Sequence, residues 1–301
     1  MDASYSFSNL CGAVYYQGNV VFTPDGKCVL SPVGNRVALY DLVNNVSRTL
    51  PFQNRKNVAH ISVSPTGEVL LSVDDDGHCL VSLLPSGRSV GEIHFKGSVS
   101  ALAFSPSNSR LLAVGVGRRV SLWKAPQPKA AFHPLRLLRI VTGAVSGDVT
   151  SLAWSCDSTM LACGSGDNAL RVITLPPLKD LVEADAASSA EEARQQKQVR
   201  VVTLAGHRDS VVGAMFTRSN KTLFTVSRDG ALFEWRLERS LDPSGQGTED
   251  SAEEEGEGDT AQKGRRPWRR VGKQFFNQSP AKLTCCSFLR ANEDRFHMLI
   301  A

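Results

Sequence analysis

The stretch that decides the fold runs from Leu204 to Leu237 and reads LAGHRDSVVGAMFTRSNKTLFTVSRDGALFEWRL. Apolar and polar residues alternate along three short segments of it, Val211–Thr217, Thr222–Ser227 and Leu232–Trp235. Turn-forming residues separate these segments, at Arg218–Lys221 and at Asp229-Gly230. Because alternation with a period of two is typical of half-buried β-strands, the stretch predicts a three-stranded antiparallel meander.

Four polar or aromatic residues of this stretch, His207, Ser227, Asp229 and Trp235, have the spacing of one WD40 blade, which the stretch resembles. The resemblance implies a structural hydrogen-bond relay. In it the imidazole of His207 contacts the carboxylate of Asp229, which holds the amides of its turn, and Ser227 and the indole of Trp235 complete the chain. A buried indole and imidazole need such partners, because an unpaired buried polar group costs about 1–3 kcal/mol.

The same histidine, serine and aspartate could also be taken for a hydrolase triad. Triads are recognised by geometry, and the sequence contains no G-x-S-x-G nucleophile elbow. The Gly-x-Gly pairs at Gly115 and Gly164 lack the rest of a dinucleotide-binding fingerprint. We therefore expect no catalytic residue and no cofactor, and the protein is predicted not to be an enzyme.

Composition agrees with an ordinary globular protein, with 42% apolar and 21% charged residues in 301. No run approaches the roughly 18 apolar residues of a membrane helix. The seven cysteines are odd in number and include no C-x-x-C pair. This pattern predicts reduced thiols in the cytosol or nucleus, packed as small apolar groups, and no metal site.

The turn after the first strand of the meander recurs six times along the chain. Its central residues are Pro24, Pro65, Pro106, Cys156, Arg218 and Arg290. A second turn follows five of them at a constant eleven residues, so the extra length falls between blades. The predicted blade cores are 18–42, 58–84, 98–125, 149–175, 204–237 and 282–301. Residues 176–203 are predicted to be an inserted loop, and 238–281 a disordered acidic and basic connector.

These repeats predict an all-β fold, an incomplete WD40 β-propeller with five blades of three or more strands and the start of a sixth. The sequence reaches Ala301 eleven residues after Arg290, where the third strand of blade six should begin. A sheet ending there would leave an unpaired edge, which natural sheets avoid. We therefore expect this sequence to be part of a longer chain.

Several segments closely resemble the periodic tryptophan protein 2 family. They are YSFSNLCGAVYYQGNVVFTPDGKCVLSPVGNRVALYDLVNN (5–45), HFKGSVSALAFSP (94–106), LAGHRDSVVGAMF (204–216) and GKQFFN (272–277). The resemblance implies a nucleolar WD-repeat scaffold of the UTP-B subcomplex. Its partners would be other subunits of the small-subunit processome, pre-rRNA and U3 small nucleolar RNA, and its role the maturation of 18S rRNA. The alternative is a cytoplasmic WD40 adaptor for a ubiquitin ligase or signalling complex.

One connector carries a marked charge pattern. Residues 249–259 hold seven acidic side chains, and residues 263–273, KGRRPWRRVGK, hold six basic ones. The basic run is a candidate patch for RNA, a partner or nuclear import, because arginine binds phosphate and tryptophan can stack on a base. Its residues are Lys263, Arg265, Arg266, Trp268, Arg269, Arg270 and Lys273. The other reading is a solvated loop whose charge blocks pair loosely.

Overall fold

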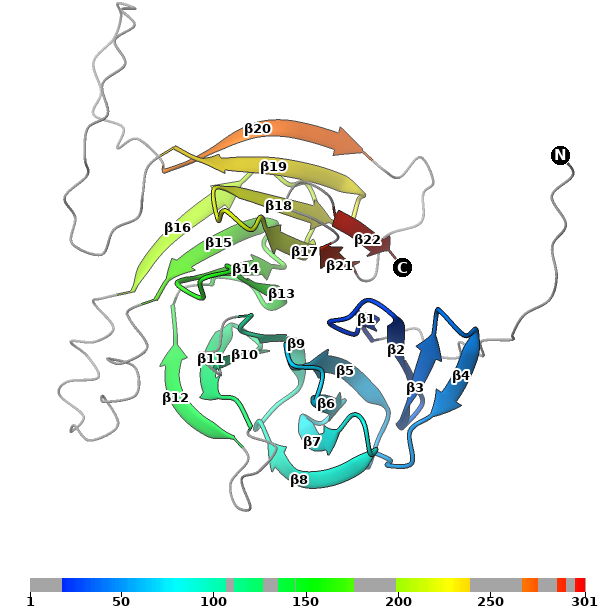
Figure 1. Ribbon diagram of the computed structural model, residues 1–301. Coiled ribbons are helices and arrows are strands. Elements are labelled where there is room, and N and C mark those ends of the chain that lie inside the picture. The colour runs from blue at the N-terminus through cyan, green and yellow to red at the C-terminus, as the bar shows by residue number, and fades with distance from the viewer. Residues whose placement is uncertain are drawn as a thin grey trace, which may run out of the picture.

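The computed structural model describes residues 18–106, 111–126, 135–143, 145–175, 199–238 and 267–275, and the backbone of strands 286–290 and 296–300. No helix occurs in these ranges, and hence none there is long and apolar enough to cross a membrane. Five antiparallel sheets of four strands and one sheet of two strands are arranged around a ring (Figure 1). The predicted incomplete β-propeller is confirmed.

Each four-stranded sheet is one blade, and its strands follow one another in chain order. Blade one contains β1 Val21–Phe22, β2 Cys28–Val33, β3 Arg36–Asp41 and β4 Val46–Thr49. Blade two contains β5 Val58–Val63, β6 Val69–Asp74, β7 His78–Leu83 and β8 Arg88–His94. Blade three contains β9 Val99–Phe104, β10 Leu111–Val116, β11 Arg119–Lys124 and β12 Arg136–Val141.

The remaining sheets continue the series. Blade four contains β13 Val149–Trp154, β14 Met160–Ser165, β15 Ala169–Thr174 and β16 Arg200–Ala205. Blade five contains β17 Val211–Phe216, β18 Thr222–Ser227, β19 Ala231–Leu237 and β20 Trp268–Phe275. The two-stranded sheet consists of β21 Cys286–Arg290 and β22 Phe296–Ile300. Strand β21 contacts both β17 and β1, so this sheet lies between blades five and one (Figure 1).

The first strand of every blade is the innermost one, and the repeated sequence turn follows it directly. The five residues Phe22, Val63, Phe104, Trp154 and Phe216 each end such a strand. A serine or threonine comes next, and in four blades its hydroxyl accepts a hydrogen bond from the amide five residues later. This local closure keeps the first hairpin the same length in those blades, which explains the constant spacing found in the sequence.

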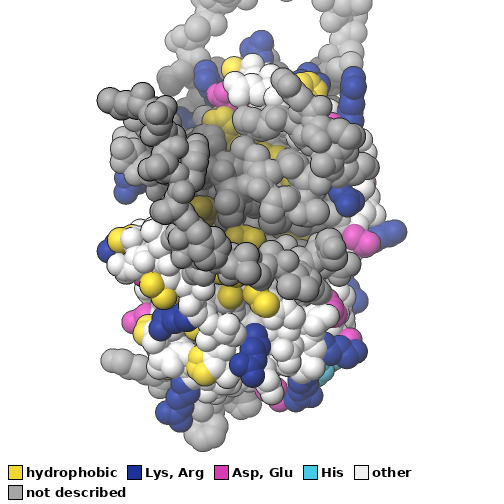
Figure 2. All heavy atoms as spheres, turned by 90° about the vertical axis from the view of Figure 1, so that its right-hand side faces the viewer, with side chains coloured by type: hydrophobic (Ala, Val, Ile, Leu, Met, Phe, Trp, Pro, Cys, Tyr) yellow, Lys and Arg dark blue, Asp and Glu magenta, His cyan; other side chains and the backbone are white. Residues whose placement is uncertain are grey.

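In the part of the chain that the structure describes, the core is divided into four apolar clusters, each of which lies between two neighbouring blades. The middle strands β6 and β14 are buried at every residue because both of their faces contact other sheets. Where described residues are uncovered in Figure 2, hydrophobic side chains reach the surface as small groups among polar and charged atoms. Scattered exposure of this kind is normal for a folded protein.

The outer strands of blades four and five correct two predicted segments. Residues 200–203, assigned to an inserted loop, belong to β16, and residues 268–275, assigned to a disordered connector, form β20. Strand β20 pairs with β19 along its length, and Trp268 is only 2% exposed. Pairing with a neighbouring strand and burial of one large ring order a segment whose charge alone suggested disorder.

Candidate functional site

The polar bridge of blade five is centred on Thr225, in the middle of β18. Its hydroxyl lies 2.7 Å from Nε2 of His207 and accepts a hydrogen bond from Nε1 of Trp235 at 3.0 Å. Thr225 is fully buried, and His207 and Trp235 are 7% and 5% exposed. Because an indole can only donate, the Thr225 oxygen accepts from Trp235 and can donate its own proton to Nε2 of a neutral imidazole.

Ser227 does not join the indole of Trp235 to complete the chain, as the resemblance implied. Its hydroxyl donates to the carboxylate of Asp229, which also accepts the amide of Ala231 at 3.3 Å. Trp235 is paired with Leu223 across the hairpin, so its indole reaches Thr225, two residues further along β18. Ser227 lies four residues from Leu223, about 13 Å along a strand, and is out of reach of the indole. The predicted relay is therefore wrong in two links, because Thr225 takes the place of Ser227 at the indole of Trp235 and the place of Asp229 at the imidazole of His207.

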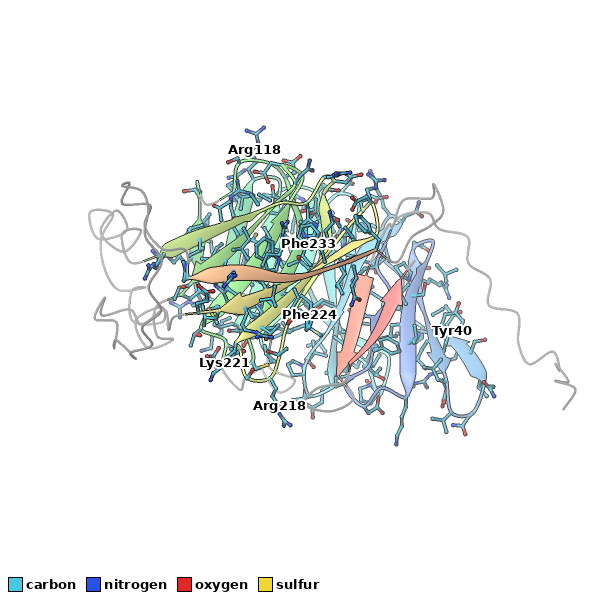
Figure 3. The ribbon with its side chains drawn as sticks, turned by 90° about the horizontal axis from the view of Figure 1, so that it is seen from above. Tyr40, Arg118, Arg218, Lys221, Phe224 and Phe233 are labelled. Atoms are coloured by element: carbon cyan, nitrogen blue, oxygen red, sulfur yellow. The ribbon has the colours of Figure 1, made fainter. Side chains whose placement is uncertain are left out.

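The surroundings of His207 favour an uncharged ring. The imidazole stacks on Phe233, with ring centroids 4.1 Å apart and planes 12° from parallel; Figure 3 labels Phe233 within the fifth sheet. Burial, with a smaller effect from the charges of Arg270 and Lys273, lowers the pKa of His207 to about 4, although Asp229 opposes the shift. Nδ1 has no hydrogen-bond partner among the described residues. Asp229 therefore acts on the ring through its charge.

Corresponding positions in other blades show what this bridge does. His207 lies 22 residues before Asp229, Thr225 lies 4 residues before it, and Trp235 lies 6 residues after it. The same offsets from Asp76 give Asn54, Ser72 and Ser82 in blade two. There the amide of Asn54 donates to the Ser72 carbonyl at 3.0 Å, and the Ser72 hydroxyl donates back to Asn54 at 2.8 Å.

Blades three and four fill these positions with mostly apolar groups. In blade three, Phe95 and Trp123 contact each other edge to face with centroids 5.3 Å apart. In blade four, Val145, Cys163 and Ile173 are all buried. Since neither blade has a histidine or a carboxylate at these positions, we infer that the bridge ties the loop before a blade to the blade's second and third strands.

Blade four holds its turn by a different device. The guanidinium of Arg171 donates to both carboxylate oxygens of Asp167, at 3.0 and 2.5 Å, and to the Ser146 hydroxyl at 3.1 Å. Arg171 is 8% exposed, and this pairing lowers the pKa of Asp167. Asp167 and Asp229 occupy the same turn position, but each is secured by a different neighbour.

The geometry does not assemble a hydrolase triad in blade five. Ser227 directs its hydroxyl to Asp229, while His207 contacts Thr225, so serine and imidazole do not form a nucleophile–base pair. Within the described ranges, no group of three or more His, Cys, Asp or Glu side chains could hold a metal ion. Cys79 and Cys163 belong to apolar clusters, where burial raises the pKa of the Cys163 thiol to about 12.

The basic patch is only partly described. Lys263, Arg265 and Arg266 lie outside the described residues, whereas Arg269, Arg270 and Lys273 are exposed on β20. The suggestion that Trp268 stacks on a base is wrong, because its ring is buried against Phe216 with centroids 6.1 Å apart. Arg270 and Lys273 lie 5.1 and 5.3 Å from the centre of the Phe233 ring.

Sequence reasoning missed Thr225, and also missed Val271 and Phe275, which are 51% and 57% exposed on β20. Thr225 could have been found by comparing blades, because Ser72 occupies the same offset from its own turn. The two β20 residues gave no comparable signal, since the sequence repeat did not identify their strand.

Comparison with known proteins supports the repeat structure. A family model for the WD domain, G-beta repeat, matches residues 87–124, 135–174 and 198–236. Each match begins in or just before the outer strand of one blade and ends in the third strand of the next. The sequence repeat therefore spans two blades, which couples neighbouring sheets through one repeat.

Whole-sequence similarity is collinear over most of the chain. The chain is 35% identical over 290 residues to periodic tryptophan protein 2 homolog of Schizosaccharomyces pombe, covering 96% of this chain and 31% of that protein. It is also 35% identical over 290 residues to periodic tryptophan protein 2 of Saccharomyces cerevisiae, covering 96% of this chain and 29% of that protein. It is 39% identical over 237 residues to periodic tryptophan protein 2 of Arabidopsis thaliana, covering 77% of this chain and 24% of that protein. The chain thus spans about a quarter to a third of its relatives' length. Over the region it shares with them, the chain is similar to the periodic tryptophan protein 2 proteins, and it carries WD40 repeats.

Proposed function

We propose that the protein is a non-catalytic scaffold in ribosome biogenesis, which supports assembly of the small-subunit processome on pre-rRNA and maturation of 18S rRNA. The observation that carries this proposal is the collinear similarity to periodic tryptophan protein 2 over 96% of the chain. The partners would be UTP-B subunits, with pre-rRNA and U3 small nucleolar RNA contacted directly or through them, and the location would be the nucleolus.

The structural role of the polar residues in blade five supports the proposal of a scaffold. In blade five, the polar side chains that could be taken for a catalytic triad instead form hydrogen bonds that join the blade's own strands and turn. A rigid ring of sheets leaves the loops on its two rims and its outer walls as contact surfaces. Figure 3 shows two such rims, with Arg118 at one edge of the ring and Arg218 and Lys221 at the other.

Sedimentation of the tagged chain from a nucleated cell tests the proposal. We expect it to migrate with large pre-ribosomal particles, to shift to smaller complexes after nuclease treatment, and to co-purify pre-rRNA and U3 RNA. A chain with Trp235→Asp, designed to disrupt blade five, is the matched control and should lose the association. Cytoplasmic migration in a nuclease-resistant complex with ubiquitin-ligase subunits would instead establish the adaptor function.

A further inference from the structure

The outer strands of blades three, four and five form a surface that differs in charge from the rest of the chain. We call β12, β16 and β20 together the outer belt (Figure 1). Their twenty residues include six cations and no acidic residue, although the whole chain has a net charge of only +4. The cations are Arg136, Arg139, Arg200, Arg269, Arg270 and Lys273.

The outer belt is also where large apolar side chains gather at the surface. Among the residues that the structure describes, five of the nine exposed large hydrophobic ones lie on it, with exposures of 38–57%. They are Leu137, Ile140, Val201, Val271 and Phe275. The other cluster of exposed apolar residues, Leu42, Val43 and Val46 at the outer turn of blade one, surrounds a hairpin held by Asp41 and has no comparable excess of cations.

A shallow groove of about 120 Å³ joins two of these strands. Ile140 and Arg139 of β12 line one side of it, and Val199 and Val201 line the other. The Arg139 side chain is half-buried, and this burial lowers the pKa of its guanidinium. A partly desolvated guanidinium beside aliphatic side chains suits a carboxylate next to an apolar group, because arginine binds carboxylates through paired, charge-assisted hydrogen bonds.

We propose that the outer belt binds an extended segment of another protein in which acidic and apolar residues are interspersed. The carboxylates would meet the arginines and Lys273, and the apolar side chains would enter the groove and cover Val271 and Phe275. β12, β16 and β20 are each the last strand of their sheet, so an extended segment can also hydrogen-bond to their outer edges. This proposal stands independently of the role in ribosome biogenesis.

The apolar residues favour a protein segment over single-stranded RNA. Sequence-tolerant RNA sites combine cations with aromatic rings on which bases stack, but four of the five exposed apolar residues are aliphatic. Trp268 is buried, and the face of Phe275 is approached by the ammonium of Lys273 at 4.6 Å from the ring centre. Cations beside aliphatic groups match an acidic and apolar polypeptide.

Fluorescence anisotropy with the full 301-residue chain tests the proposal directly. The probe is a labelled twelve-residue peptide of three Glu-Leu-Asp-Val repeats, compared with the same peptide carrying Gln and Asn for its acids and with a twelve-nucleotide uridine RNA. We expect the acidic peptide alone to bind, with an affinity that falls as salt rises. Binding of the RNA but not of the acidic peptide would overturn the proposal and make the belt a nucleic-acid surface.

Two variants of equal charge change locate the binding. The belt variant carries Arg136→Gln, Arg200→Gln and Arg269→Gln, and the control carries Lys96→Gln, Arg118→Gln and Arg208→Gln at exposed positions near the loops. We expect the belt variant to bind the acidic peptide about tenfold more weakly and the control to change by less than about twofold. Equal loss in both would show attraction by overall charge and refute a site on the belt.

The apolar contribution is tested separately with Ile140→Asn and Val201→Asn, which change exposed side chains without changing charge. We expect weaker binding of the acidic peptide in the double variant, with an unchanged thermal melting curve. Unaltered affinity would remove the groove from the proposed site.

Discussion

Phe95 and Trp123 contact each other edge to face in blade three, in the two positions that His207 and Trp235 occupy in blade five. The positions lie between an inter-blade loop and a third strand in both cases. An aromatic pair fills the space in one blade, and a histidine–threonine–tryptophan bridge fills it in the other. The position therefore requires a well-packed connection, and hydrogen bonds are needed only where the residues are polar.

Replacing Thr225 by valine should destabilise the fold by about 1–3 kcal/mol. The substitution keeps the shape of the side chain but leaves the buried indole N–H of Trp235 and Nε2 of His207 without their shared partner. Urea unfolding at pH 7 measures the loss.

The matched comparison for this change is Trp235→Phe, alone and combined with Thr225→Val. If the bridge is a unit, the double variant should lose less than the two single losses added together, because the second change removes a group already unpaired. Additive losses would contradict the bridge.

Acid should weaken the fold through His207. Burial lowers the pKa of its imidazole to about 4 in the folded protein, whereas an unfolded histidine titrates near 6.5. Between these values the unfolded chain binds the proton more readily, so stability is lost as the pH falls from about 6.5 toward 4. The loss from this residue is about 3 kcal/mol or less.

His207→Asn is the control for the pH effect, because Asn54 already occupies the corresponding position in blade two. Urea unfolding at several pH values between 4 and 7 should give a flatter dependence for the variant. Some dependence should remain, since burial also lowers the pKa of His60 to about 4. Identical slopes in both proteins would show that His207 is not protonated preferentially in the unfolded state.

The inner part of each blade could be predicted from the sequence because two local signals agree there. Alternation along strands such as β17 predicts the hairpin, and the serine or threonine after it closes the first turn in the same way in four blades. These interactions are formed by residues close together in the chain, so the pattern of residues is sufficient to reveal them.

The outer strands and the choice of Thr225 depend on contacts that the pattern does not contain. Strand β20 follows β19 only after a connector of thirty residues, and its order comes from pairing with β19 and from burial of Trp268. Likewise, Ser227 and Thr225 both fit the alternating pattern of β18, so the pattern does not tell them apart. Only the register, which places Leu223 opposite Trp235, decides which hydroxyl the indole reaches.

Replacing Gly77 by alanine should strongly destabilise the fold. Its φ of +87° is unfavourable for a residue with a side chain, and an added Cβ would overlap the carbonyl oxygen of Gly97 in the next loop. We expect Gly77→Ala to cost about 3 kcal/mol in unfolding free energy. Gly34→Ala is the control, since Gly34 has a φ of +59° but open space around it, and should cost about 1 kcal/mol. Equal costs would mean that the contact between the two loops does not constrain the fold.

Removing charge from the basic run should weaken nuclear and nucleolar enrichment. The variant carries glutamine at Arg265, Arg266, Arg269 and Arg270, and we expect reduced enrichment because clustered cations are what import carriers and RNA recognise. The measurement is the nuclear-to-cytoplasmic ratio of a fluorescent fusion. The control carries glutamine at four other cationic positions, Arg36, Arg118, Arg119 and Arg208, all of which are exposed.

The pair Arg265→Gln and Arg266→Gln separates this role from binding at the outer belt. These two residues precede β20 and are not part of the belt, whereas Arg269 and Arg270 belong to it. If the run acts in localisation through its own charge, the pair should lower nuclear enrichment while leaving affinity for the acidic peptide unchanged. Unchanged localisation of the fourfold variant would mean that the run is a solvated segment joined to a structural strand.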